Sequence, residues 1–460
     1  MGGKTLLVDF NAQYGLFAHF VEPVFRQIGL SVFNFSLVMS LLLAISYAFV
    51  FVFIYRTISN NFLRVSAFFL VLFFSYGFTW RLGQDSPDSY FQYWPIRTVF
   101  PMMTLFLSCL SYRTRPLNSF LFTFLIALGI FWNQDTGIVA YVTWILCLIY
   151  NKTYTMPTRW QWANLQSIIW GIVIFVVSVI SVYGFLTLRS GKSLNLDHFF
   201  FYQKLFAGSG YYMLPMPLAG LWVVIASVYI TGLAIALYNL LKRKHFIFSR
   251  SVFACSILGL GLFLYYQGRS FEGNLLPVSY PAIILVFLFA DKILKTMQSS
   301  KRLEIQKVIM FALLFFFAVD IMGTILLNSS EFFTLLKLRI GALKKNRTPE
   351  VSNDIYFLKQ QTHPGEKIYL APPTYEVFDD SYKCNLEGVY YAETGTSNAL
   401  NIEGCAERVL VASDEKFEKV VKSTRGKHTK IFIAESEADK YTGFRIIARS
   451  SGGDLVQIAR

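Results

Sequence analysis

Residues 117–150 have the sequence LNSFLFTFLIALGIFWNQDTGIVAYVTWILCLIY, in which a short polar segment separates two apolar ones. A helix needs about 20 apolar residues to cross a bilayer, and each apolar half is shorter than that. A polar turn at membrane depth is tolerated only where protein surrounds it, because hydrocarbon offers no hydrogen bonds. The stretch therefore predicts two helices, at 117–132 and 138–150, that form a hairpin within a larger helical bundle.

Similar apolar segments recur along most of the chain. They fall at 31–55, 63–80, 98–112, 163–188, 218–241, 251–267, 277–291 and 304–328. Of the 460 residues, 54% are hydrophobic and 15% are charged, whereas a soluble domain carries about 25% charged residues. We therefore predict an α-helical polytopic membrane protein with about 8–10 membrane segments, located in the cell membrane.

The net charge of +14 would indicate a nucleic-acid partner if the basic residues formed one patch. They gather instead in alternate loops, where acids are few. These loops are 56–64, 113–115, 152–159, 242–250 and 292–302. Cytoplasmic loops of membrane proteins carry an excess of Lys and Arg. We therefore expect these loops in the cytoplasm, and we expect no nucleic-acid partner.

The remaining loops then lie on the outer side of the membrane. They are 81–97, 133–137, 189–216 and 268–276, together with the segment before residue 30. A charged N-terminal segment on that side needs a preceding span, and none precedes it in this sequence. We therefore expect that a natural first transmembrane helix is missing from it.

The character of the sequence changes after residue 345, where charged residues rise and long apolar runs end. Short strands are predicted at 367–371, 408–412 and 430–434, and helices at 349–361 and 414–424. Strands that alternate with helices favour a small soluble α/β domain. We expect a transmembrane domain at 1–328, a linker at 329–345 and an extracytoplasmic α/β domain at 346–460.

Two arginines on the predicted outer side adjoin apolar segments. Arg97 follows Tyr93 within a run of aromatic residues, and Arg269 lies between Gly268 and Ser270. Tyr93 fits an interfacial aromatic belt, an arginine there can extend to the interface, and Arg269 could pair with Glu272. An arginine can also bind a phosphate through two parallel N–H groups. Arg97, Arg269 and Tyr93 are therefore candidate phosphate- or donor-binding residues.

Four acids on the same side are candidates for chemistry. Asp135 either caps the helix that follows, as Asn133 also could, or lies at the floor of an outward cavity. Asp9, Asp85 and Asp88 are either loop acids or candidate catalytic bases. A divalent metal could bind at Asp85 and Asp88, although two carboxylates alone do not establish a site.

Four short motifs occur in order along residues 1–328. They are NAQYGL at 11–16, YWPIR at 93–97, WNQDTG at 132–137 and GRS at 268–270. Together they resemble the GT-C type integral-membrane glycosyltransferases, which include protein mannosyltransferases and bacterial lipid-linked arabinosyl and mannosyl transferases. The resemblance implies a polyprenyl-phosphate sugar donor, an acceptor outside the cytoplasm, and a catalytic acid in the first outer loop. Asp9 is the candidate for that acid, and without the first span its match stays open.

The resemblance implies sugar transfer with inversion at the anomeric carbon. A carboxylate of Asp9, Asp85 or Asp88 would deprotonate an acceptor hydroxyl, while Arg97 and Arg269 stabilise the leaving phosphate. The acceptor could be a glycan, a lipid or a protein, and no cofactor is certain. Two alternatives stay open: a polysaccharide polymerase or ligase, and a polytopic transporter, which should show internal repeats and charges near mid-span.

Overall fold

The computed structural model divides the chain into two compact units. Unit 1 contains Met1–Val38, Leu186–Gln203 and Lys337–Arg460, and unit 2 contains Met39–Phe185 and Lys204–Leu336. The structure describes residues 5–8, 11–12, 14–81, 93–110, 116–155, 160–209, 214–270, 272–299, 337, 349–371, 390–398, 430–434, 444–449 and 453–458.

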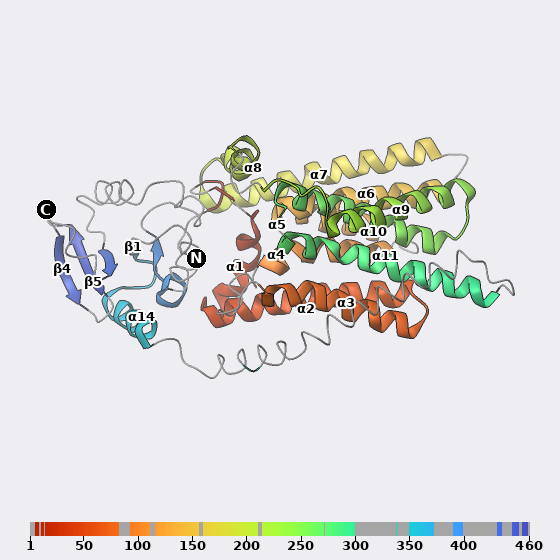
Figure 1. Cartoon of the computed structure of the whole chain (residues 1–460). Helices are drawn as coiled ribbons and strands as arrows, with labels where there is room; N and C mark the ends of the chain where they lie inside the picture. The colour runs from red at the N-terminus through yellow and green to blue at the C-terminus, as the bar shows by residue number, and fades with distance from the viewer. Residues whose placement is uncertain are drawn as a thin grey trace. The chain divides into compact units, whose positions relative to one another are not determined.

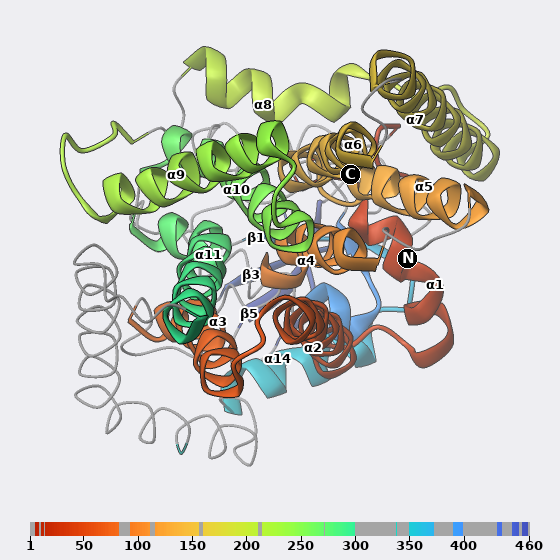
Figure 2. The same ribbon diagram turned by 90° about the vertical axis from the view of Figure 1, so that its right-hand side faces the viewer.

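Unit 2 is a bundle of long helices (Figure 1). The helices that contribute to it are α2 (Val32–Thr57), α3 (Asn61–Arg81), α4 (Tyr93–Leu110), α5 (Pro116–Trp132), α6 (Gln134–Thr155), α7 (Trp160–Ser190), α8 (Asp197–Ser209), α9 (Leu221–Lys242), α10 (Phe246–Gly268) and α11 (Glu272–Ser299). Helix α10 packs on α4, α6, α9 and α11, which surround it when the bundle is viewed along its length (Figure 2). Its apolar side chains are therefore buried on several faces, as the consecutive residues Val252, Phe253 and Ala254 illustrate.

Four described helices are long and apolar enough to cross a membrane, judged by length and composition. They are Val32–Thr57, Asn164–Ser190, Leu221–Lys242 and Phe246–Gly268, and shorter apolar helices occur at Asn61–Leu72, Trp94–Leu110 and Phe120–Trp132. Apolar side chains such as Phe51, Ile180 and Ile230 are exposed on these helices, as lipid-facing residues would be. The predicted polytopic helical class is confirmed, and the predicted span at 304–328 lies outside the described residues.

The predicted hairpin is formed by α5 and α6, but its turn is shorter than expected. Only Asn133 separates the two helices, so the prediction that the second helix begins at 138 was wrong. The Asn133 side-chain oxygen accepts hydrogen bonds from the Thr136 backbone N–H and hydroxyl, both at 3.0 Å. This N-cap satisfies the first turn, so the polar residues after it join the helix.

Glycines let the two helices of the hairpin approach closely. A Cβ atom at Gly137 would overlap the backbone of Gly129 and Ile130, so only glycine fits there. Farther along the hairpin, the Trp144 ring N–H donates to the Thr123 hydroxyl at 2.8 Å. The hairpin is therefore a tightly packed pair within the bundle.

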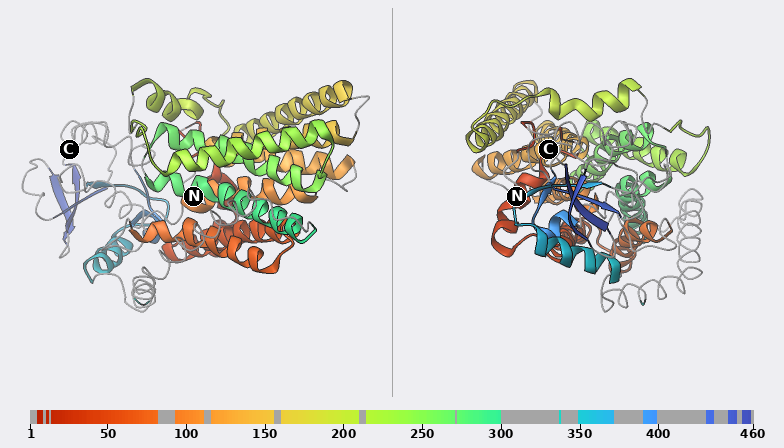
Figure 3. Two further views of the ribbon diagram at one scale, coloured as in Figure 1. Left: turned by 45° about the vertical axis from the view of Figure 1, so that its right-hand side comes forward. Right: turned by 90° about the vertical axis from the view of Figure 1, so that its left-hand side faces the viewer.

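The C-terminal part of unit 1 holds a five-stranded sheet (Figure 3). Its order is β2-β1-β3-β5-β4, with β1 (Lys367–Ala371), β2 (Ser397–Asn398), β3 (Lys430–Ala434), β4 (Phe444–Arg449) and β5 (Gly453–Ile458). β1 pairs in parallel with β2 and β3, and β5 pairs antiparallel with β3 and β4.

Helix α14 (Pro349–Gln361) supplies Ile355 and Leu358 to the core of this α/β domain, which also contains residues of β1, β3 and β5. The predictions of strands at 367–371 and 430–434 and of a helix at 349–361 are confirmed. The strand predicted at 408–412 and the helix predicted at 414–424 lie outside the described residues. The antiparallel strands β4 and β5 were not predicted.

Candidate functional site

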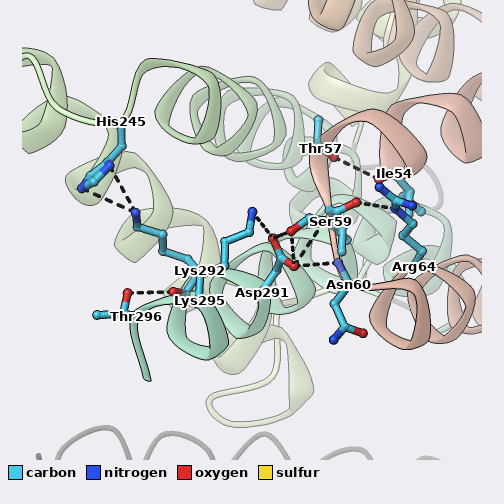
Figure 4. A network of polar contacts seen from close by, with 11 residues as sticks. Ile54, Thr57, Ser59, Asn60, Arg64, His245, Asp291, Lys292, Lys295 and Thr296 are labelled. Carbon is cyan, nitrogen blue, oxygen red and sulfur yellow. Dashed lines mark hydrogen bonds and ion pairs between the residues drawn. The ribbon is translucent and has the colours of Figure 1, made fainter. Parts of the chain in front are cut away.

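Three of the predicted cytoplasmic loops meet at one end of unit 2, which we call the basic end (residues 56–64, 109–110, 242–250 and 291–296). The Asp291 carboxylate accepts hydrogen bonds from the backbone N–H groups of Ser59 and Asn60, at 3.2 and 2.9 Å, and it pairs with Lys295 at 2.9 Å (Figure 4). The Lys292 ammonium lies 3.1 Å from the His245 ring nitrogen Nδ1. These contacts bring together loops that lie far apart in the sequence.

Three of the sequence motifs meet at the other end of unit 2, which we call the polar end (residues 93–97, 132–137 and 265–270). The Trp132 ring N–H donates to the Ile96 carbonyl at 2.9 Å, and its ring packs 6.0 Å from that of Phe100. The guanidinium carbon of Arg97 lies 4.5 Å from the centre of the Tyr265 ring. The structure thus brings together segments that the sequence analysis assigned to one side of the membrane.

Arg97 lies close to the N-terminus of α4 and is half-buried. Backbone N–H groups and the helix dipole favour an anion at a helix N-terminus. Stacking on Tyr265 fixes the plane of the guanidinium, and a planar fork of N–H groups suits phosphate oxygens. Tyr265 was not singled out in the sequence, because its pairing with Arg97 joins residues far apart in the chain.

Arg269 follows the last residue of α10, one helical turn after Tyr265. Its backbone N–H donates to the Tyr266 carbonyl at 3.0 Å, and its own carbonyl accepts from Asn274 Nδ2 at 3.0 Å. A β-bridge to Leu214 adds a third contact to the backbone. The base of the Arg269 side chain is therefore fixed, whereas the side chain of Glu272, its predicted alternative partner, lies outside the described set.

The structure places the predicted acids unevenly. Asp135 is exposed in the first turn of α6, where a carboxylate interacts favourably with the helix dipole, and Asn133 provides the cap. Asp9, Asp85 and Asp88 lie outside the described residues, as does the side chain of Tyr93. Their predicted roles stay predictions.

A metal site is not formed by the described part of the chain. No group of three or more His, Cys, Asp or Glu side chains there could hold an ion. The described cysteines, Cys109, Cys147 and Cys255, are free thiols within the apolar helices.

Unit 1 contains a buried carboxylate that the sequence analysis did not select. Glu22, in α1 (Phe17–Ile28), accepts hydrogen bonds from Arg189 at 2.6 Å and from Arg26 at 2.9 Å. Burial raises the pKa of Glu22, but the bonds from Arg189 and Arg26 outweigh it and lower the pKa to about 2. The i, i+4 spacing of Glu22 and Arg26 was visible in the sequence, whereas the contact with Arg189 was not.

His19 completes this cluster. Its Nε2 atom accepts a hydrogen bond from the Leu6 backbone N–H at 3.0 Å, and its Nδ1 atom lies 3.6 Å from Glu22. Burial lowers the pKa of His19, and the positive charge of Arg189 lowers it further. With both arginines already bound to Glu22, the cluster ties α1 to the end of α7 and has a structural role.

Comparisons with known proteins give one weak structural likeness. No family model matches the chain, and no curated protein matches it. A crystal structure of ArnT from Cupriavidus metallidurans in the apo state is similar over 97% of this chain and 88% of that one, with 11% sequence identity and a TM-score of 0.49. A likeness of this size adds nothing about chemistry, which rests on the residues of the polar end.

Proposed function

We propose that this protein is a membrane glycosyltransferase that transfers a sugar from a polyprenyl-phosphate-linked donor to an extracytoplasmic glycan, lipid or protein. The observation that carries the proposal is the stacking of Arg97 on Tyr265, one helical turn before Arg269, at one end of an apolar helical bundle. Positive charge beside apolar helices suits a ligand with a phosphate and a prenyl chain. The resemblance of the sequence motifs to GT-C enzymes supports the same substrate class.

In this reaction the acceptor oxygen attacks the anomeric carbon while the bond from that carbon to the phosphate oxygen breaks. The electron pair of the broken bond stays on polyprenyl phosphate, and Arg97 and Arg269 stabilise the charge that develops there. The acceptor hydroxyl gives its proton to a carboxylate, for which Asp9, Asp85 and Asp88 are the candidates. Attack opposite the leaving group inverts the configuration of the sugar.

Asp135 has a different part in the proposal. Its carboxylate is exposed at the polar end, in the turn that follows the buried Trp132. A carboxylate there can accept hydrogen bonds from sugar hydroxyls, so we assign it to donor binding. Tyr93, at the start of α4, is assigned to donor binding beside Arg97.

The test replaces each arginine of the polar end with alanine. Membranes that carry the Arg97→Ala or Arg269→Ala variant are incubated with radiolabelled polyprenyl-phosphate mannose or arabinose and an envelope fraction from a deletion strain. We expect release of polyprenyl phosphate to fall about 10²–10³-fold, which is typical for loss of one group that stabilises developing charge. Normal transfer by both variants would overturn the proposal.

Arg64→Ala is a matched control at the basic end. The Arg64 guanidinium carbon lies 4.6 Å from the centre of the Tyr55 ring, so this variant also removes an arginine stacked on a tyrosine. We expect it to transfer sugar at the normal rate. If all three variants lost activity equally, the loss would reflect stability of the bundle rather than donor binding.

A further inference from the structure

The corner between α5 and α6 contains two buried amide side chains with unused hydrogen-bonding groups. Asn133 is 1% exposed and Gln134 is 2% exposed. Within the described part of the chain, neither Gln134 Nε2, nor Gln134 Oε1, nor Asn133 Nδ2 has a hydrogen-bond partner. The Asn133 oxygen is already used by the helix cap, so its Nδ2 group is what remains.

Unpartnered buried amides are uncommon, because removing an amide from water without a replacement hydrogen bond costs free energy. An amide also cannot lose its polarity by a change of protonation, as a buried acid or base can. A ligand that supplies both donors and acceptors would remove the cost. This makes the corner a candidate binding site rather than a packing element alone.

The corner adjoins the arginine of the polar end. Asn133 directly follows Trp132, whose ring N–H is bonded to the carbonyl of Ile96, the residue before Arg97. Gln134 is the first residue of α6, and the next residue, Asp135, is exposed. The two amides therefore lie at the edge of the bundle, next to the proposed phosphate site.

We propose that Asn133 and Gln134 bind the sugar of the donor, with their amides hydrogen-bonded to its hydroxyl groups. The proposal rests on the proposed function and assigns the sugar subsite within it. A hydroxyl both donates and accepts, which matches the donor and acceptor groups of Gln134. A phosphate would accept hydrogen bonds only from the donor group of the amide, and a prenyl chain would form no hydrogen bond with either group.

The test compares binding of undecaprenyl phosphate with binding of undecaprenyl-phosphate mannose and undecaprenyl-phosphate arabinose, using the purified full chain in nanodiscs. In Gln134→Leu we expect about tenfold weaker binding of the preferred sugar-bearing lipid, equivalent to ~1.4 kcal/mol, and unchanged binding of the bare lipid. Asn133→Ser keeps an oxygen for the helix cap and loses the Nδ2 donor, and we expect the same selective loss.

Two controls separate sugar binding from other effects. Thr143→Val removes a buried hydroxyl elsewhere on α6 that lacks a partner among the described residues, and we expect both lipids to bind as in the wild type. Arg97→Ala should weaken binding of the bare lipid and the sugar-bearing lipids alike.

The outcomes distinguish the two proposals. Wild-type binding of both kinds of lipid by Gln134→Leu, or an equal loss for both with a lower melting temperature, would overturn the sugar subsite. The sugar subsite would also be overturned if the wild type bound the sugar-bearing lipids no more tightly than undecaprenyl phosphate. If the wild type did not bind undecaprenyl phosphate, or Arg97→Ala bound it normally, the proposed function would fail.

Discussion

The two ends of the helical bundle each contain a buried polar side chain, and these two side chains differ in their hydrogen bonding. At the basic end, the buried Asp291 carboxylate is held by Ser59, Asn60 and Lys295. At the polar end, Gln134 is as deeply buried, yet its amide has no partner in the part of the chain that the structure describes. Hydrogen-bonded polar groups stabilise a fold, whereas a buried unpartnered amide beside a charged site is a candidate for ligand binding. The contrast between these two side chains supports a structural role for Asp291 and the proposed binding role for Gln134.

Both ends contain an arginine stacked on a tyrosine, so this contact does not distinguish them. Arg64 stacks on Tyr55 at the basic end, and Arg97 stacks on Tyr265 at the polar end, at 4.6 and 4.5 Å. Arg64 also donates to the Asn61 side chain at 2.8 Å, within the first turn of α3. A stacked arginine is therefore not by itself a functional signal, and its neighbours decide its role.

The largest predicted effect comes from a substitution that disrupts helix packing at the polar end. In Gly137→Ala the new Cβ would overlap the Gly129 backbone, and overpacking of this kind typically costs about 3 kcal/mol. We expect a lower melting temperature and loss of donor binding. Gly184→Ala is the control, because a Cβ there meets no described atom within 4 Å. Equal stability of the two variants would contradict the close packing of α5 on α6.

A second prediction separates stability from binding. Asp291→Leu leaves two backbone N–H groups at the basic end without their acceptor, at a cost of about 2–3 kcal/mol. We expect the unfolding free energy to fall while donor affinity stays normal. Gln134→Leu should lower the donor affinity while the unfolding free energy stays normal. Lys295→Ala, which removes only the half-exposed partner, should cost less than about 1 kcal/mol. A loss of donor affinity in Asp291→Leu would weaken the contrast between the ends.

A third prediction applies the same rule to the satisfied cluster in unit 1. The pKa of Glu22 is lowered to about 2, so its stabilising effect is complete above its ordinary pKa and is lost as the pH falls toward 2. Between these limits we expect the wild type to lose on the order of 2 kcal/mol more than Glu22→Gln. Melting temperatures across that pH range give the measurement, and parallel curves for the two proteins would show that Glu22 is not held by its arginines.

The smallest predicted effect compares the two stacked arginines by stability alone. Arg97→Ala should cost no more than about 1 kcal/mol, the size of one partly exposed cation–π contact. Arg64→Ala should cost somewhat more, because Arg64 also donates hydrogen bonds to the Asn61 side chain and the Ile58 carbonyl. Thermal unfolding of the two variants checks this. A much larger loss for Arg97→Ala would mean that Arg97 supports the bundle, and its effect on transfer would then need another explanation.

Local sequence patterns predicted the helical segments well, because length and apolar composition determine them. The start of α6 was placed at 138 because the four residues from Gln134 to Gly137 look like a loop until the Asn133 cap is seen. The strands β4 and β5 were missed, since β4 alternates charged and apolar residues weakly and β5 begins at a glycine.

The site was predictable only in part, for a similar reason. Arg97 and Arg269 were selected by their position beside apolar segments, which is a local property. The stacking of Arg97 on Tyr265 and the bond between Glu22 and Arg189 join residues that are far apart in the chain. No spacing rule within a single sequence encodes such pairs.

The glycine contact between α5 and α6 has a mechanical consequence. With the backbones of Gly129 and Gly137 touching, and Trp144 bonded to Thr123 farther along, the two helices cannot slide past each other. They form one rigid pair. Because the Trp132 ring N–H is hydrogen-bonded to the Ile96 carbonyl, the position of this pair constrains the first turn of α4, next to Arg97.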